Sequence, residues 1–287
     1  MQEFLSISSN GEPLAESRRC SADGKWRATE PPDLSSVASG VLALLLPVTP
    51  SASSVETYTI DGVKREAIVY AGTGPAPKTG RPLVLAFHGH GGNMRYSERK
   101  HRIETLWPEA MAVYPQGLPT KGMTDPEGKK NGWQQQPRDG GGRDLKFVDA
   151  ILARTKGYDP KRVYVMGHSN GGRFTYVLWA ERGEKFAAYG PSGSPALRPF
   201  ARLKPAPFLA TAGESDPIIA FRTQKIGIDA LLRRAGAELS TGTKSGPLTL
   251  AKGKDGIEVG TYFYPGGHEY PDEAVEATIA FFKRIGG

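Results

Sequence analysis

The sequence predicts an α/β protein with a mostly parallel central sheet, helices on both faces and an antiparallel hairpin at the start. Short apolar runs recur along the chain, and such runs are typical of strands that a parallel sheet buries on both faces. Segments with helical periodicity alternate with these runs from residue 55 to the end, which is the pattern of a sheet covered by helices. No repeat or linker divides residues 55–287, so we expect one domain there.

Each element has its own signal. The opening hairpin is expected because Asp61-Gly62, a strong turn pair, separates Glu56–Ile60 from Arg65–Tyr70. Buried strands are expected at five apolar runs: Pro82–Phe87, Met111–Tyr114, Arg162–Met166, Phe208–Ala212 and Thr261–Tyr264. Helices are expected between and after them: Arg143–Lys156, Gly172–Arg182, Ile219–Ala235 and Asp272–Ile285. Pro271 suits the first turn of the last helix.

The first 54 residues differ from the rest and predict an export signal. Val37–Val48 is too short to span a bilayer, but it has the length of a secretory apolar segment. Small residues follow it at 49–54, where a signal peptidase would cut. Because the stretch before it is long and acidic, we expect an extended start; the alternative is a disordered cytosolic tail. The expected location is secreted or periplasmic, otherwise cytoplasmic, without stable membrane insertion.

Composition excludes several classes of protein and site. Cys20 is the only cysteine, so an intramolecular disulfide or a cysteine-based zinc site is impossible. The net charge of +7 invites a nucleic-acid interpretation. However, the basic residues are scattered, and nucleic-acid binding requires a contiguous basic face or a recognition motif. We therefore expect no nucleic-acid partner.

A candidate nucleophile follows the Arg162–Met166 strand. The chain there reads Gly167-His168-Ser169-Asn170-Gly171-Gly172 and then enters a helix. A serine on such a strand-to-helix turn is held in a strained conformation with its hydroxyl exposed, and the flanking glycines remove side chains that would collide. The alternative is a glycine-rich turn that merely packs a helix on a strand.

A base and an acid are available for Ser169. A serine hydroxyl needs an imidazole to take its proton, and that imidazole needs a carboxylate. His268 lies after the last expected strand, and Asp216 follows the Phe208–Ala212 strand, so both are expected at the same sheet edge as Ser169. Glu214 competes with Asp216. The chain order Ser, Asp, His is that of α/β-hydrolases.

Two backbone amides are expected to stabilise the oxyanion that forms during acyl transfer. One is the N–H of Asn170, directly after the nucleophile. The other comes from the loop after Pro82–Phe87, where we favour the N–H of His90, with Gly89 as the fallback. A phosphate-binding turn is the alternative, but the loop lacks the Lys-Ser/Thr ending. His88 is expected to brace this loop; a metal site from His88 and His90 has no third ligand. We expect no metal and no cofactor.

Two residues are candidates for substrate binding. Trp133 lies in a long polar loop, residues 118–142, where an exposed ring would stack on an aromatic acyl group. The alternative is that Trp133 anchors the loop onto the body of the protein. His168, beside the nucleophile, is a candidate for the acyl pocket, with a structural role as the alternative.

Together these segments resemble the bacterial polyhydroxybutyrate depolymerase-like and feruloyl esterase family of α/β-hydrolases. The resemblance runs from about residue 57 to the end and rests on these motifs: Phe87-His88-Gly89-His90-Gly91-Gly92, Trp107-Pro108, Tyr114-Pro115-Gln116-Gly117, Asn131-Gly132-Trp133, Phe147-Val148-Asp149, Gly167-His168-Ser169-Asn170-Gly171-Gly172 and Gly266-Gly267-His268. It implies Ser169 as nucleophile, His268 as base, Asp216 as acid and oxyanion donors near His90 and Asn170. It also implies export, no cofactor, and substrates that are hydroxycinnamic or short hydroxyalkanoate esters.

The expected function is therefore serine carboxylic-ester hydrolysis through an acyl-enzyme, on feruloyl, aryl or short-chain hydroxyalkanoate esters. The partner would be a small-molecule or polymer-linked ester. Many extracellular polymer depolymerases carry disulfides and an extra substrate-binding domain, and this chain departs from them in having no cysteine after Cys20. The alternatives are a serine peptidase on the same fold and a binding protein that has kept the fold without catalysis.

Overall fold

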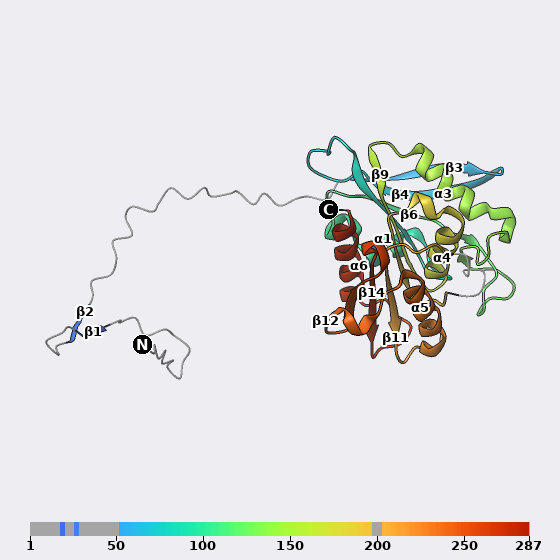
Figure 1. Ribbon diagram of the computed structural model, residues 1–287. Coiled ribbons are helices and arrows are strands. Elements are labelled where there is room, and N and C mark those ends of the chain that lie inside the picture. The colour runs from blue at the N-terminus through green and yellow to red at the C-terminus, as the bar shows by residue number, and fades with distance from the viewer. Residues whose placement is uncertain (1–17, 21–25, 29–51, 197–202, 287) are drawn as a thin grey trace. The chain divides into compact units, whose positions relative to one another are not determined.

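The computed structural model of the chain describes residues 18–20, 26–28, 52–196 and 203–286 (Figure 1). The chain divides into two compact units, Met1–Pro47 and Val48–Gly287. In the first, β1 (Arg18–Cys20) pairs antiparallel with β2 (Trp26–Ala28). The predicted export segment at 37–48 lies outside the described residues. No described helix has both the length and the apolar character that crossing a bilayer requires.

The second unit is built on one large sheet, which has ten strands over the described residues, in the order β12-β13-β14-β11-β10-β9-β5-β6-β4-β3. The central strands are parallel: β6 (Met111–Pro115), β5 (Arg81–Phe87), β9 (Tyr158–His168), β10 (Ala188–Ser192), β11 (Phe208–Gly213) and β14 (Glu258–Tyr264). Antiparallel hairpins extend both edges: β3 (Ser53–Ile60) with β4 (Val63–Tyr70), and β12 (Thr243–Ser245) with β13 (Leu248–Lys252). The predicted fold class is confirmed.

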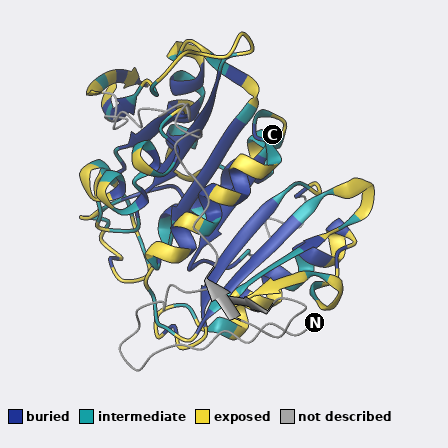
Figure 2. Cartoon of the chain, turned by 90° about the vertical axis from the view of Figure 1, so that its left-hand side faces the viewer, coloured by how far each residue is buried: buried dark blue, intermediate teal, exposed yellow. Residues whose placement is uncertain are grey.

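Helices cover both faces of this sheet. One face carries α3 (Arg143–Arg154), α4 (Asn170–Arg182) and α5 (Phe221–Ala235); the other carries α1 (Met94–His101), α2 (Ile103–Leu106) and α6 (Asp272–Ile285) (Figure 1). Alternate residues of β5 enter the two cores: Leu83 and Leu85 pack under α3 and α4, and Val84 and Ala86 pack under α1 and α6. The central strands are therefore dark blue, the colour of buried residues, while the helices show exposed residues in yellow on their outer surfaces (Figure 2).

Some elements were not expected from the sequence. Strand β10 reads Ala-Tyr-Gly-Pro-Ser, and its Gly190 and Pro191 are typical of turns. In the structure a Cβ on Gly190 would lie 2.6 Å from Thr278 Cγ2, so glycine is required there for α6 to pack closely against the sheet. The β12–β13 hairpin was also not expected, and β9 extends beyond the predicted Arg162–Met166 at both ends.

Two buried histidines, His88 and His101, and the half-buried His168 are also part of this fold. Burial lowers the pKa of His88 and of His101 to about 4, although a hydrogen bond to a backbone carbonyl opposes the shift in each case. Burial, together with the neighbouring His268, lowers the pKa of His168 to about 3. All three imidazoles are therefore neutral in the folded protein at neutral pH.

Replacement of Gly190 by alanine is expected to destabilise the protein by about 1–3 kcal/mol, because the new methyl group overlaps Thr278 and approaches Met166 Cβ at 3.1 Å. Thermal unfolding of Gly190→Ala measures this loss as a lower Tm. Adding Thr278→Ser, which removes Cγ2 and keeps the hydroxyl, should recover part of it. Gly183→Ala is the matched control, since a Cβ on Gly183 would have its nearest atoms at an ordinary contact distance of 3.8 Å. An equal decrease in the Tm of Gly183→Ala would contradict the idea that close packing on Thr278 requires glycine at position 190.

Acidification below about pH 6 is expected to destabilise the fold through these histidines. An unfolded histidine takes up a proton near pH 6.5, whereas in the folded protein the pKa values of His88, His101 and His168 are lowered to about 4, 4 and 3. The unfolded state therefore binds more protons, and the free energy of unfolding should fall by roughly 1.4 kcal/mol per pH unit for each of these histidines below about pH 6.

Urea unfolding at several pH values between 7 and 4.5 measures this slope. Replacing His101 by phenylalanine should reduce the slope by about a third, because one of three proton uptakes is lost. A free energy of unfolding that stays flat over this range would show that these histidines are not neutral in the folded state.

Candidate active site

Ser169 occupies the turn that joins β9 to α4. Its backbone has φ +55° and ψ −117°, a region that residues with a side chain rarely adopt. The strain is held by hydrogen bonds on both sides: the N–H of Ser169 donates to Ser192 O at 2.8 Å, and its carbonyl accepts from the N–H of Arg173 at 2.9 Å. The turn lifts the hydroxyl off the end of the sheet at the start of the helix.

The glycines around Ser169 leave no space for side chains. A Cβ on Gly171 would lie 2.2 Å from Phe87 O, and one on Gly167 would lie 2.6 Å from the backbone of Gly171. A Cβ on Gly172 would lie 2.5 Å from Ser192 O. Helix α4 therefore packs directly onto the ends of β5 and β10, which explains the Gly-x-Ser-x-Gly-Gly pattern.

A continuous chain of hydrogen bonds links the three residues predicted from the sequence. The hydroxyl of Ser169 donates to His268 Nε2 at 2.8 Å, and His268 Nδ1–H donates to Asp216 Oδ2 at 2.7 Å. One tautomer of His268, with its proton on Nδ1, satisfies both contacts. The three side chains come from the carboxyl ends of β9, β11 and β14, and 99 and 52 residues separate the bonded pairs along the chain.

Asp216 is held as an anion beneath His268. Burial raises the pKa of its carboxyl group, but the hydrogen bond from His268 and those from the amides of Ile219 and Ile218 outweigh burial and leave the pKa below its usual value. Gln224 Nε2 also donates to Asp216 Oδ2, at 2.9 Å. Glu214, the competing acid, is exposed to solvent, and Asp216 is the carboxylate that contacts the imidazole.

The loops that carry Asp216 and His268 are bonded to each other. The N–H of Ser215 donates to Gly266 O at 3.0 Å. The hydroxyl of Tyr264 donates to Gly267 O at 2.9 Å, and a Cβ on Gly213 would lie 2.1 Å from that same oxygen. The loops thus approach too closely for a side chain at Gly213, and this contact fixes the imidazole over its carboxylate.

The loop after β5 brings backbone amides beside Ser169. Gly89 lies so close that a Cβ on it would be 3.6 Å from Ser169 Cβ. The amides of Gly91 and Gly92 are engaged with Asn131 O and Gly89 O, which leaves those of Gly89 and His90 as the loop's candidates for an oxyanion. Asn170 is the first residue of α4, and the first amides of a helix have no intrahelical acceptor.

His88 braces this loop, as predicted. It is 1% exposed, its Nδ1–H donates to Gly89 O at 2.8 Å, and its Nε2 accepts the N–H of Gly117 at 3.0 Å. Both ring nitrogens of His88 are therefore engaged in hydrogen bonds. Neither nitrogen is available to bind a metal, so His88 does not fit the alternative of a metal site at His88 and His90. No group of three or more metal-binding side chains occurs among the residues that the structure describes.

The two residues proposed to bind substrate lie away from the cleft. Trp133 is fully buried, its indole stacks on Phe174 with ring centroids 5.5 Å apart, and its Nε1–H donates to His88 O at 2.9 Å. The stacking prediction is corrected: the ring anchors the 118–142 loop. His168 does not line the cleft either, because its Nε2–H donates to His268 O at 3.1 Å and its Nδ1 contacts Ser192 Oγ at 3.1 Å. It supports the His268 loop.

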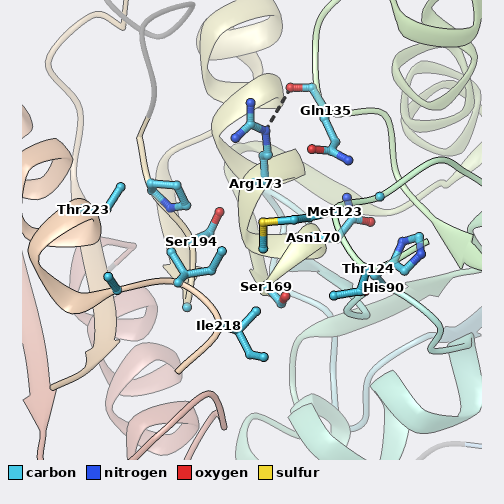
Figure 3. A pocket seen from close by; sticks show the side chains of 15 residues that line it. His90, Met123, Thr124, Gln135, Ser169, Asn170, Arg173, Ser194, Ile218 and Thr223 are labelled. Carbon is cyan, nitrogen blue, oxygen red and sulfur yellow. Dashed lines mark hydrogen bonds between the residues drawn. The ribbon is translucent and has the colours of Figure 1, made fainter. Parts of the chain in front are cut away.

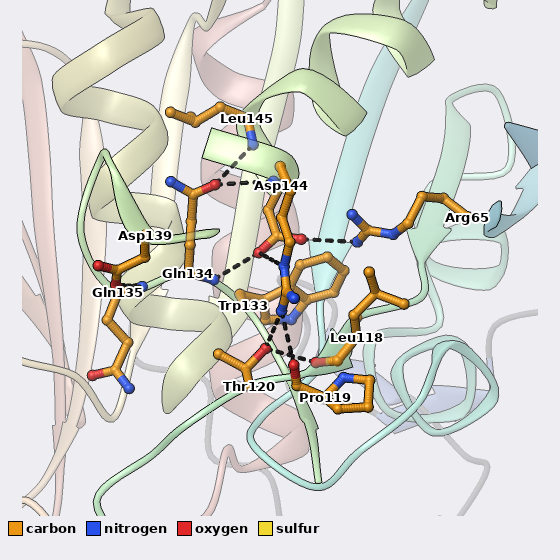
Figure 4. Close-up of polar contacts among 12 residues, drawn as sticks. Arg65, Leu118, Pro119, Thr120, Trp133, Gln134, Gln135, Asp139, Asp144 and Leu145 are labelled. Carbon is orange, nitrogen blue, oxygen red and sulfur yellow. Dashed lines mark hydrogen bonds and ion pairs between the residues drawn. The ribbon is translucent and has the colours of Figure 1, made fainter. Parts of the chain in front are cut away.

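A buried ion pair fixes the 118–142 loop further (Figure 4). Arg65 and Asp144 are almost completely buried and lie 2.9 Å apart. Asp144 also accepts the N–H of Gln134 at 2.7 Å, and Gln134 Oε1 accepts the N–H of Asp144 at 2.9 Å. Within the loop, β7 (Leu118–Pro119) pairs with β8 (Asn131–Gly132). The loop is thereby held as a fixed wall of the site.

A cleft of about 470 Å³ opens above Ser169 (Figure 3). The sequence did not indicate most of its lining, which comes from the 118–142 loop, from α4, and from the segments after β10 and β11: Gly122, Met123, Thr124, Gln135, Asn170, Arg173, Gly193, Ser194, Pro195, Ile218, Ile219, Ala220 and Thr223, together with His90. Arg173 is the lining residue that the sequence could have indicated, because a residue one helical turn after the nucleophile lies on the same side of the helix.

The sequence is similar to two esterase-named proteins. It is 30% identical over 167 residues to a bifunctional acetylxylan esterase/xylanase of Neocallimastix patriciarum, covering 56% of this chain and 23% of that protein. It is 28% identical over 187 residues to the protein NocK of Nocardia uniformis subsp. tsuyamanensis, which carries an esterase name. That alignment covers 61% of this chain and 52% of NocK. The chain therefore spans about a quarter and about half of these relatives' lengths. No protein-family model matches it.

Solved esterase structures have the same architecture. The acetyl xylan esterase from Aspergillus awamori aligns over 79% of this chain and 99% of its own, with a TM-score of 0.57 and 16% identity. A ferulic acid esterase aligns over 82% of this chain and 98% of its own, with a TM-score of 0.54 and 15% identity. S-formylglutathione hydrolase from Staphylococcus aureus aligns over 80% of this chain and 96% of its own, with a TM-score of 0.54 and 14% identity. At these identities the likeness concerns the fold, and the chain has the α/β-hydrolase fold.

Proposed function

We propose that the protein is a serine carboxylic-ester hydrolase that works through an acyl-enzyme. The observation that carries this proposal is the hydrogen-bond chain from Ser169 through His268 to Asp216, with bonds of 2.8 and 2.7 Å, beside the cleft that Ser169 lines. The similarity to esterase-named relatives supports it.

In the proposed reaction, Ser169 Oγ attacks the ester carbonyl while His268 Nε2 accepts its proton. Asp216 stabilises the imidazolium, since its carboxylate already accepts the Nδ1–H bond. The amides of Asn170 and of His90 or Gly89 stabilise the oxyanion. His268 then protonates the leaving alcohol, and water repeats the sequence on the acyl-enzyme to release the acid.

The proposed substrates are feruloyl or other aryl esters and short hydroxyalkanoate esters. Two observations support a compact substrate. The cleft volume of about 470 Å³ falls within the range of small-molecule sites, and two of the similar proteins are named as esterases of acetylated xylan and of ferulic acid. The substrate can be free or linked to a polymer, since the cleft opens to solvent at Met123 and Ile218, which are 72% and 46% exposed.

We also propose that residues 1–54 are a leader and that the catalytic domain, residues 55–287, acts in the periplasm or outside the cell. The support comes from the sequence: an apolar run at Val37–Val48 followed by small residues at 49–54.

Replacement of Ser169 by alanine should reduce kcat/KM for 4-nitrophenyl butyrate by about a thousandfold or more, because the attacking oxygen is lost. Ser215→Ala is the matched control, since Ser215 is exposed and bonds through its backbone. Near-normal activity of Ser169→Ala with an unchanged Tm would contradict the proposal. A panel of methyl ferulate, hydroxybutyrate oligomers and a peptide anilide ranks the substrate classes and tests the peptidase alternative.

Expression of the full chain in a bacterial host tests the leader. The mature protein should be found in the periplasm or medium after a cut among the small residues 49–54 that removes the leader, and mass spectrometry of its N-terminus measures the position of the cut. Leu44→Arg with Leu45→Arg should keep the full chain uncleaved, because a charged segment is a poor export signal. Uncleaved wild-type protein confined to the cytoplasm would contradict export.

A further inference from the structure

The cleft above Ser169 contains an arginine that the proposed reaction does not use. Among its described lining residues, Arg173 is the only one of the types Lys, Arg, Asp and Glu. Figure 3 shows it on α4, the helix that begins directly after Ser169, with its guanidinium beside Gln135. A half-buried cation in an otherwise uncharged cleft is a feature that an anionic group of a ligand can use.

Arg173 is held in place by the wall of the cleft. Its Nε–H donates to Gln135 O at 3.2 Å, and Gln135 belongs to the loop that Trp133 and the Arg65–Asp144 pair anchor. Helix α4 begins at Asn170, so Arg173 follows Ser169 by one turn and projects from the same end of the helix. The guanidinium therefore has a fixed position relative to the nucleophile.

The guanidinium of Arg173 is partly desolvated within the cleft. Burial lowers the pKa of the guanidinium, and the nearby carboxylate of Asp139 opposes this effect only in part. Asp139 is exposed, and its Oδ2 accepts the N–H groups of Gln135 and Gln136 at 3.0 and 2.9 Å. A carboxylate beside a partly desolvated guanidinium interacts with it more strongly than one beside a fully hydrated guanidinium.

The remainder of the cleft suits an apolar chain. Met123 and Ile218 lie at its rim and are 72% and 46% exposed, which is unusual for large apolar side chains. Pro195, Ile219 and Ala220 continue this surface within the cleft. A ligand that matches the site would therefore have an apolar body between its ester group and its charge.

We propose that Arg173 is a specificity-determining residue that binds a carboxylate of the ester substrate, so that the preferred substrates are acidic esters with an apolar spacer. This inference rests on the proposed ester hydrolysis and narrows it. Of the two substrate groups considered above, hydroxyalkanoate oligomers end in a carboxylate, whereas the feruloyl group carries an uncharged phenol. Arg173 favours the oligomers, with the charge in either the acyl or the alcohol part of the substrate.

Matched pairs of charged and neutral esters determine whether Arg173 binds a carboxylate in the acyl part or in the alcohol part of the substrate. The acyl arm compares 4-nitrophenyl hydrogen adipate with 4-nitrophenyl hexanoate, and the alcohol arm compares 4-carboxyphenyl butyrate with 4-carbamoylphenyl butyrate. In one arm, the wild-type protein should prefer the charged member by roughly ten- to hundredfold in kcat/KM, and Arg173→Gln should remove that preference. Arg173→Lys should keep part of it, since it keeps the charge and loses the fork geometry.

A neighbouring arginine provides the control for long-range charge. Arg222 is exposed on α5 and does not line the cleft, so Arg222→Gln should leave the charged-to-neutral ratio within about twofold, because an exposed charge is screened. Equal kcat/KM values for both members of both pairs in the wild type would overturn the proposal, as would a preference that survives Arg173→Gln in a folded protein of unchanged Tm.

A binding measurement separates this inference from the proposed catalysis. Titration of the Ser169→Ala protein with monoethyl adipate should show binding that the Ser169→Ala, Arg173→Gln protein lacks. If no ester were hydrolysed but this difference in binding were found, the proposed reaction would fail and the carboxylate site would stand. If esters were hydrolysed and the two variants bound monoethyl adipate equally, the carboxylate site would fail.

Discussion

The structure depends on a backbone contact that leaves no room for a side chain. Where β9 turns into α4, Gly171 lies against the carbonyl oxygen of Phe87 and Gly172 against that of Ser192. The helix can therefore begin directly at the end of the sheet, and Ser169, between strand and helix, takes a positive φ. A bulkier residue at these glycines would push α4 outward and move the hydroxyl away from His268. The same contact places the first amides of α4 and the loop after β5 on the two sides of one small space.

The rest of the site follows from the topology of the sheet. Strands β9, β11 and β14 are parallel and lie within four neighbouring positions of the sheet, so the loops at their carboxyl ends meet at one edge. The backbone hydrogen bonds from Glu214 and Ser215 to Tyr264 O and Gly266 O then turn this proximity into fixed geometry. His168 and Trp133 contribute from behind, because they hold the loops that carry the reacting groups and do not face the cleft.

The sequence predicted those parts of the molecule that local patterns determine. The parallel strands, the turn at Ser169 and the order of Asp216 and His268 behind their strands could be predicted, because apolar runs and glycines mark them. Strand β10 could not, since Gly190 and Pro191 are typical of turns and only the packing of Thr278 explains the glycine. The burial of Trp133 depends on partners that are distant in sequence, and the lining of the cleft comes from segments that only the folded chain brings together.

The two outer strands of the sheet are protected by different means. Strand β12 has only three residues, all exposed, with Lys244 at its centre, and a short, charged strand is a poor template for another chain. Strand β3 is longer, but Arg154 from α3 donates a hydrogen bond to Thr57 O at 2.6 Å and pairs with Glu56 at 3.3 Å. An incoming strand would have to displace this guanidinium from the edge. A sheet of this width is thus discouraged from growing by recruitment of a second molecule, which favours solubility at high concentration.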